Sequence, residues 1–132
     1  MNDVSEKFIE YGLKSENKGT IRNPDGYGKV KGECGDTIEY FIRIEEKKIS
    51  DIKCMVDGCI NSNACANALI TVAKDKSIKQ VLAITPNDVD DFLETLPKNE
   101  FHCAEMAIDA IELAIKDHLI NSKNSWKKQY LK

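Results

Sequence analysis

Apolar and polar residues alternate along two neighbouring segments in the first half of the chain. The apolar residues of segment 37–45 share one face: Ile38, Tyr40, Ile42 and Ile44. Three more alternate after the short connection at residues 46–48: Ile52, Cys54 and Val56. A period of two is typical of half-buried strands, so the two segments predict an antiparallel hairpin. A third strand fits over residues 27–32, although its glycines weaken that prediction.

Beyond Cys59 the apolar period becomes that of a helix. Apolar residues three and four positions apart predict an amphipathic helix over residues 61–75, with a stripe formed by Cys65, Ala68, Leu69 and Val72. A second stripe predicts a long helix from about residue 102 to 120. Shorter helices are predicted over residues 3–13, from a Ser77 cap to Leu82, and after the start signal Thr85-Pro86-Asn87-Asp88.

Strands followed by helices predict the α+β class, with a small antiparallel sheet packed against helices and a long C-terminal helix. The length of 132 residues fits one domain, which we place at residues 1–121. Residues 122–132 form a basic tail that contains four lysines and Trp126. The tail is interpreted as a flexible, solvated terminus. Docking onto a partner remains the alternative, because an exposed tryptophan is unusual without one.

Composition and charge exclude several classes of protein. With 42% hydrophobic and 31% charged residues, the chain is globular rather than disordered. A net charge of −3 argues against a nucleic-acid-binding surface. No apolar run approaches the length of a membrane span, and the polar first residues do not form a secretory signal. We therefore expect a cytoplasmic protein whose five cysteines are reduced.

Three of the cysteines stand where the predicted backbone changes direction. Cys34 lies in a turn before the first hairpin strand, whereas Cys59 and Cys103 open helices. A helix N-terminus favours a thiolate and lowers its pKa. Soft thiolates with an imidazole (His102) and a carboxylate (Asp36) suit zinc or iron–sulfur ligation. The separations of 25 and 44 residues match no local zinc motif, so purely structural roles for these cysteines stay open.

The other candidate residues are interpreted as structural. Cys54 and Cys65 lie on the apolar stripes of their own elements, where a cysteine behaves as a small hydrophobic residue. His118 falls late in the last helix among polar neighbours, and we interpret it as a surface cation near the helix end.

Three short motifs taken in order resemble a known family. Cys34-Gly35-Asp36, then Gly58-Cys59, then His102-Cys103 are similar to the U-type iron–sulfur cluster assembly scaffolds, IscU and the N-terminal domain of NifU. The resemblance implies a three-stranded antiparallel sheet covered by helices. It also implies a [2Fe–2S] cluster that is assembled from iron and from sulfur supplied by a cysteine desulfurase, and then transferred to apo-proteins.

The resemblance also implies roles for individual residues. Cys34, Cys59 and Cys103 would be the thiolates that hold the cluster. Asp36 and His102 would be accessory ligands of the metal. Cys103 would accept sulfur from the desulfurase. It is therefore the one residue to which the resemblance gives a catalytic role, that of sulfur acceptor.

The chain departs from the family pattern in front of His102. Residues 96–100 read Leu-Pro-Lys-Asn-Glu where the family has Leu-Pro-Pro-Val-Lys, which places handover through the Hsp70-type chaperone in doubt. Glu33 adds a negative charge beside Cys34. The 43 residues between Cys59 and Cys103 leave no room for the insertion of the zinc-dependent SufU branch, which favours the scaffold branch.

Three hypotheses follow for the function. The first is a non-enzymatic scaffold for a [2Fe–2S] cluster. The second is a zinc-dependent sulfur acceptor that relays persulfide from a cysteine desulfurase. The third is a structural zinc domain, whose closed site would be needed for folding. In the first case Zn²⁺ could still occupy the ligands of the isolated protein, because it suits the same donors.

Overall fold

A computed structural model describes the backbone of residues 4–130 and the side chains of residues 4–121. The predicted α+β fold is confirmed, with strands preceding most of the helices. In chain order the elements are α1 (Glu6–Leu13), β1 (Gly26–Lys31), β2 (Thr37–Glu45), β3 (Lys48–Asp57), α2 (Ile60–Ala73), α3 (Ile78–Leu82), α4 (Pro86–Leu93), the 3₁₀ turn η1 (Lys98–Glu100) and α5 (Phe101–Tyr130).

The sheet contains the three predicted antiparallel strands in the order β1-β2-β3. In the hairpin, Tyr40 of β2 pairs with Cys54 of β3. The predicted connection at 46–48 is one residue too long, because Glu46 and Lys47 alone make the turn and Lys48 begins β3. Both turn residues have positive φ angles, 52° and 64°, which suits the right-handed twist of a tight hairpin.

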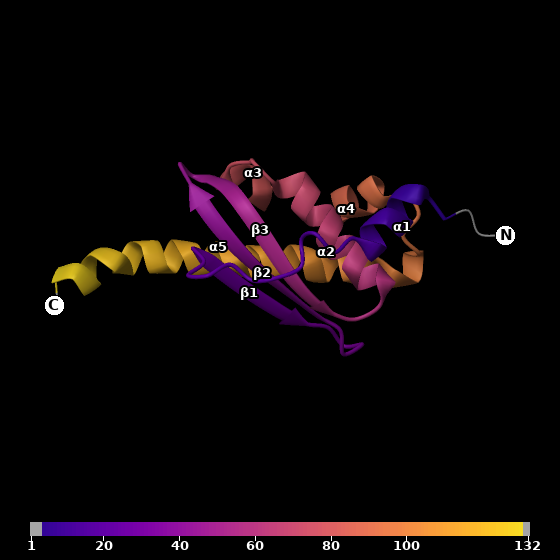
Figure 1. Cartoon of the computed structure of the whole chain (residues 1–132), viewed down its shortest axis with the longest axis horizontal. Helices are drawn as coiled ribbons and strands as arrows, with labels where there is room; N and C mark the ends of the chain where they lie inside the picture. Colours follow the sequence, from indigo (N-terminus) through magenta and orange to yellow (C-terminus); the bar gives the residue numbers. More distant parts are fainter. Residues whose placement is uncertain (1–3, 131–132) are drawn as a thin grey trace.

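Helices cover one face of the sheet. In Figure 1, α5 crosses behind β1 and β2, and α1, α2 and α4 gather at the end of the molecule opposite to the last turns of α5. The inward residues of β2 are completely buried: Ile38, Tyr40 and Ile42. Residue 28 in β1 is a glycine because a Cβ atom there would overlap the carbonyl oxygen of Ala110 in α5. The strand glycines therefore mark the close approach of α5.

The helix α2 is buried on most of its surface, which corrects the prediction of an amphipathic helix. Even Asn67 is buried, and its side-chain amide donates hydrogen bonds to the carbonyl oxygens of Tyr11 and Lys14 at 2.7 and 3.3 Å. The reason is tertiary: α1, α4, α5 and β3 all pack against α2. A helix in such a position keeps little solvated surface.

The observed caps confirm two of the predicted helix starts and correct the first. The Ser5 hydroxyl accepts a hydrogen bond from the N–H of Phe8, so α1 begins at Glu6 rather than at residue 3. Ser77 and Thr85 both form capping boxes, at the starts of α3 and α4.

At the other end of the chain, α5 continues past the predicted end at residue 120 to Tyr130. His118 consequently lies within α5, well before its C-terminal turn, which corrects the expected position near the helix end. The flexibility expected of residues 122–132 stays a prediction, because their side chains lie outside the described residues.

Among the helices of residues 4–130, none combines the length and the apolar character that a membrane crossing requires. The loop before β2, the end of β3, the start of α2 and the start of α5 meet at one end of the molecule (Figure 1). This end carries the residues that the sequence singles out for chemistry.

Candidate metal centre

The first part of the centre is the turn between β1 and β2, which presents Cys34. The N–H of Gly35 donates to the carbonyl oxygen of Gly32 at 3.0 Å and closes the turn. Gly35 has a φ of 91°, in the left-handed region that side chains disfavour. Cys34 is exposed at the tip of this turn, and Asp36 follows at its base, just before β2.

The second part is the start of α2, where Cys59 occupies the cap position and is exposed. Its side chain makes no capping hydrogen bond. Instead, the N–H of Cys59 donates to Oδ2 of Asp36 at 3.3 Å. Gly58 makes room for this contact, because a Cβ atom there would lie 2.6 Å from Cγ of Asp36. The carboxylate thereby joins the β1–β2 turn to the start of α2.

Ser62, which the sequence analysis did not single out, links Asp36 to the third cysteine. Its buried hydroxyl donates to Oδ2 of Asp36 at 2.7 Å and lies 3.4 Å from Sγ of Cys103. The hydrogen bond from Ser62 is the main cause that lowers the pKa of Asp36 below its usual value. The backbone N–H and thiol of Cys59 and the thiol of Cys34 lower this pKa further.

Asp36 therefore accepts a hydrogen bond from the backbone of Cys59 and reaches Cys103 through Ser62. A purely structural Asp36 would instead accept a hydrogen bond from a neighbouring N–H within its own turn. The observed backbone partner is Cys59, 23 residues along the chain.

The third part is the first turn of α5, where Cys103 is completely buried. The expectation that a helix start lowers the pKa of Cys103 is wrong. Burial is the dominant cause, and it raises the pKa of this thiol to about 12 despite the opposing hydrogen bond with Ser62. Loss of hydration thus outweighs the helix N-terminus at this position.

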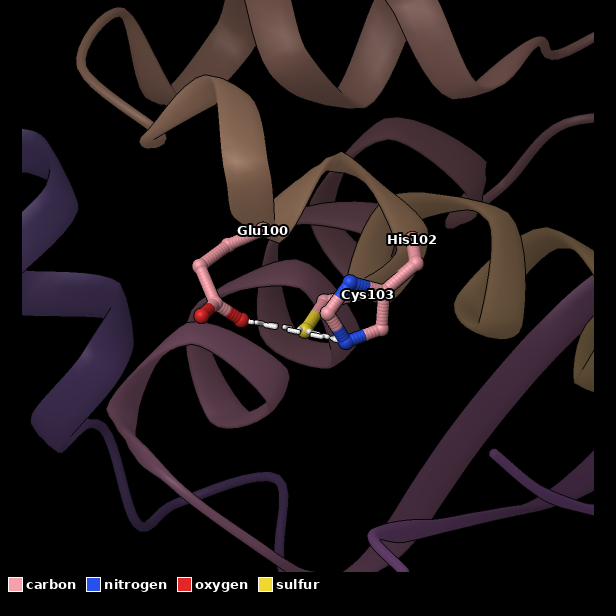
Figure 2. A group of neighbouring side chains, drawn as sticks. All are labelled: Glu100, His102 and Cys103. Carbon is pink, nitrogen blue, oxygen red and sulfur yellow. Dashed lines mark hydrogen bonds and ion pairs between the residues drawn. The ribbon is translucent and has the colours of Figure 1, made fainter. Parts of the chain in front are cut away.

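Two further side chains flank the buried thiol, as Figure 2 shows. Nε2 of His102 lies 3.6 Å from Sγ of Cys103, and the thiol points at Oε2 of Glu100, also at 3.6 Å. Nε2 of His102 and Oε2 of Glu100 are 3.8 Å apart. Glu100, His102 and Cys103 are therefore grouped closely enough for one ion.

The sequence analysis noted Glu100 only as a departure from a family motif. Ser62 and Glu100 could have been found in the sequence from their spacing to the cysteines. Ser62 follows Cys59 by three residues and Glu100 precedes Cys103 by three, so each pair lies on one face of a helical turn.

Cys34 and His102 line the same surface cavity of about 710 Å³ between the β1–β2 turn and α5. Acidic residues also border this cavity: Glu33, Glu105 and Asp109. Cys34 and His102 therefore face the same opening to solvent. The acidic residues at its border favour the approach of cations.

The remaining two cysteines are core residues, as predicted. Cys54 is 1% exposed and Cys65 is completely buried. Burial raises the pKa of Cys54 to about 11 and that of Cys65 further still. Neither is a member of the centre described above.

The donors that meet at this end are chemically matched to iron or zinc. Three thiols and an imidazole are soft or borderline ligands, and two carboxylates, Asp36 and Glu100, add hard oxygen donors. All five predicted site residues lie at this end. Hydrogen bonds through Asp36, Ser62 and Cys103 join four of them, and Cys34 shares the cavity with His102.

Comparison with known proteins points the same way. A family model described as the NifU-like N-terminal domain matches residues 3–125. The iron–sulfur cluster assembly scaffold protein IscU 1 of Archaeoglobus fulgidus is 35% identical over 115 residues, covering 86% of this chain and 75% of that protein. The iron–sulfur cluster assembly scaffold protein IscU of Escherichia coli is 34% identical over 119 residues, covering 86% and 92%.

A solved structure shares the fold at much lower identity. The N-terminal part of a NifU-like protein from Brucella abortus superposes with a TM-score of 0.73 at 13% identity, covering 86% of this chain and 92% of that one. At this level of identity the likeness concerns the fold alone.

Proposed function

The chain belongs to the family of the NifU-like N-terminal domain, and from this premise we propose that it is a scaffold for iron–sulfur cluster assembly. A [2Fe–2S] cluster would be built on it from iron and sulfur and then passed to apo-proteins. The observation that carries the proposal is the meeting of Cys34, Cys59 and Cys103 from three distant segments at one end of the fold, with Asp36 and His102 among them.

The proposed mechanism divides the work between exposed and buried ligands. Cys34 and Cys59 are exposed, so their thiolates can bind iron and remain within reach of an acceptor protein. Asp36 offers a carboxylate oxygen, which matches the iron of a cluster less well than thiolate does. A centre with such a ligand favours release over permanent storage of the cluster.

Sulfur would come from a cysteine desulfurase, with Cys103 as the acceptor. Because Cys103 is completely buried, direct attack on a persulfide in the desulfurase requires the segment 98–103 to move outward. In that step the Cys103 thiolate would attack the outer sulfur of the desulfurase persulfide. A new S–S bond would form on Cys103, and the desulfurase cysteine would leave as a thiolate.

The partners in this proposal are a cysteine desulfurase and apo iron–sulfur proteins. The role is non-enzymatic, because the cluster is a cargo. Reduced cysteines are required, which agrees with the expected location in the cytoplasm. The altered segment 96–100 gives no support to handover through an Hsp70-type chaperone.

Anaerobic reconstitution with iron, cysteine and a desulfurase tests the proposal. We expect the chain to acquire iron and sulfide in a ratio near one and to pass the cluster to an apo-ferredoxin. Cys54→Ser serves as the control, because it changes a core thiol outside the centre.

Two other results would favour the alternatives. Persulfide turnover that needs zinc but no iron would indicate the sulfur relay, to which the Glu100, His102 and Cys103 donors are also suited. Folding that requires zinc, with neither activity, would indicate a structural zinc domain.

A further inference from the structure

Glu100 occupies a position beside the centre that the proposed function leaves without a role. It ends the 3₁₀ turn η1 (Lys98–Glu100), and its side chain is 27% exposed. In Figure 2 its carboxylate approaches the Cys103 sulfur from the side opposite to the imidazole of His102. Within the described residues, Cys103 and His102 are the polar side chains that this carboxylate contacts.

The spacing of the three donor atoms matches the geometry of a metal ion. Tetrahedral Zn²⁺ with ordinary bond lengths places S–N and S–O ligand pairs about 3.6 Å apart and an N–O pair about 3.4 Å apart. The observed S–N and S–O distances are both 3.6 Å, and the N–O distance is 3.8 Å. An ion could therefore bind with shifts of only a few tenths of an ångström.

The two carboxylates of the centre differ in what already holds them. Asp36 accepts hydrogen bonds from the hydroxyl of Ser62 and from the N–H of Cys59, so these contacts would compete with a metal for its oxygens. Within the described residues, the carboxylate of Glu100 accepts one hydrogen bond, from the thiol of Cys103, and lies 3.8 Å from Nε2 of His102. That proton is lost when the thiol binds a metal. Glu100 is thus the carboxylate that can bind a cation without breaking a link between elements.

We propose that Glu100, His102 and Cys103 form a binding site for one divalent cation, Fe²⁺ or Zn²⁺, with Glu100 as a direct ligand. On binding, the metal replaces the thiol proton of Cys103, which passes to solvent. Three protein donors leave a fourth position open for a further ligand. The site deepens the proposed function and depends on it for its purpose, because it would receive the first metal before Cys34 and Cys59 are engaged.

The test uses the full chain with Cys34 and Cys59 both replaced by alanine, so that the two exposed thiols cannot bind the probe. Zn²⁺ alone is titrated by calorimetry into this protein and into two derivatives, Glu100→Gln and Glu112→Gln. Glu112 is an exposed acid further along α5, so its replacement removes the same charge away from the site.

We expect one Zn²⁺ per chain, an affinity at least about tenfold lower for Glu100→Gln, and a change below about twofold for Glu112→Gln. Equal affinities for the two derivatives would overturn the proposal, as would the absence of binding in the doubly substituted chain. Co²⁺ provides a second readout on the unsubstituted chain. Its visible d–d bands should shift with Glu100→Gln and stay unchanged with Glu112→Gln, and identical spectra would contradict the assignment.

These titrations contain no sulfide and no acceptor protein. A chain that binds Zn²⁺ through Glu100 but transfers no cluster would contradict the scaffold function alone. A chain that transfers clusters with unaltered Zn²⁺ affinity in Glu100→Gln would contradict the Glu100 site alone.

Discussion

The interior of the sheet–helix layer and the end of the molecule where β2, α2 and α5 begin use the same residue type in two ways. In the interior, Cys54 and Cys65 are buried on β3 and α2. At the end, Cys34 and Cys59 are exposed, and Cys103 is as deeply buried as Cys65. Burial alone therefore does not separate the two regions.

The neighbours of the two fully buried thiols make the difference. Cys103 has Ser62, Glu100 and His102 within 3.4–3.6 Å of its sulfur. Cys65 makes no side-chain hydrogen bond within the described residues and belongs to the apolar core. A buried thiol that is surrounded by polar donors and acceptors can exchange its proton for a metal, whereas one in an apolar core can do so only at a large cost in free energy.

The largest expected difference between the regions is in chemical reactivity. Cys34 and Cys59 should react with iodoacetamide at neutral pH at least about a hundredfold faster than Cys54. Burial limits access to Cys54 and raises the pKa of its thiol to about 11, which lowers its thiolate fraction. Peptide mapping by mass spectrometry over a time course measures each rate. Comparable rates at Cys54 and Cys59 in the folded chain would remove the distinction.

The next largest effect concerns the retention of the cluster. Replacing Cys34, Cys59 or Cys103 by serine should lower the iron and sulfide content after reconstitution by about tenfold or more, because a ligand is lost. Cys54→Ser and Cys65→Ser should load normally per folded molecule. Iron and sulfide analysis of gel-filtered protein decides this, and normal loading of Cys59→Ser would count against the assignment of ligands.

A third expectation concerns the free energy of unfolding, for which substitutions in the interior should have the larger effect. Cys65→Ser should lower the free energy of unfolding by about 1–3 kcal/mol, because it buries a hydroxyl that has no partner in the apolar core. Cys34→Ser should change it by less than about 0.5 kcal/mol, because its side chain is exposed. Urea denaturation of the apo-proteins measures both. Equal losses in the two variants would show that the turn of Cys34 contributes as much to stability as the core.

The interior was largely predictable from sequence because its signals are local. The period of two found both hairpin strands, and the hydroxyl caps at Ser77 and Thr85 found the starts of α3 and α4. The burial of α2 was not predicted. Asn67, a polar residue outside the predicted apolar stripe, is buried because its amide finds carbonyl partners in Tyr11 and Lys14. Tertiary packing supplies such partners, and the period of apolar residues in the sequence carries no information about them.

The sequence led to the candidate ligands, whose role stays a prediction, and it misjudged the pKa of one of them. Cysteines at element ends, and the order of three motifs, pointed to all five proposed ligands. The pKa of Cys103 was misjudged because the helix N-terminus is visible in the sequence and the depth of burial is not. Ser62 and Glu100 were missed because single polar residues in a helical turn are common without any special role.

A smaller effect tests the hydrogen bond from Ser62 in α2 to Asp36 in the turn before β2. Asp36 has a lowered pKa in the folded chain, so its ionised form contributes stability that is present above the unfolded value and is lost as the pH falls through the folded value. Ser62→Ala removes the largest cause of the lowering. The variant should therefore lose less additional stability than the parent between about pH 5 and pH 3.

Urea denaturation at the two pH values measures this difference. Ser50→Ala is the matched control, because its hydroxyl bonds to the carbonyl oxygen of Arg43, away from the centre. A pH dependence in Ser62→Ala that is identical to that of Ser50→Ala would show that Ser62 does not govern the ionisation of Asp36.

The central claim is that this end of the molecule holds a cluster in order to release it, and cluster transfer measures it most directly. Loaded wild-type chain and loaded Asp36→Ala are mixed anaerobically with an apo-ferredoxin, and transfer is followed by circular dichroism. We expect the wild type to transfer its cluster and Asp36→Ala to transfer more slowly per loaded molecule, because the harder carboxylate ligand is gone. A loaded wild type that transfers nothing, or an Asp36→Ala protein that transfers equally fast or faster, would contradict the account.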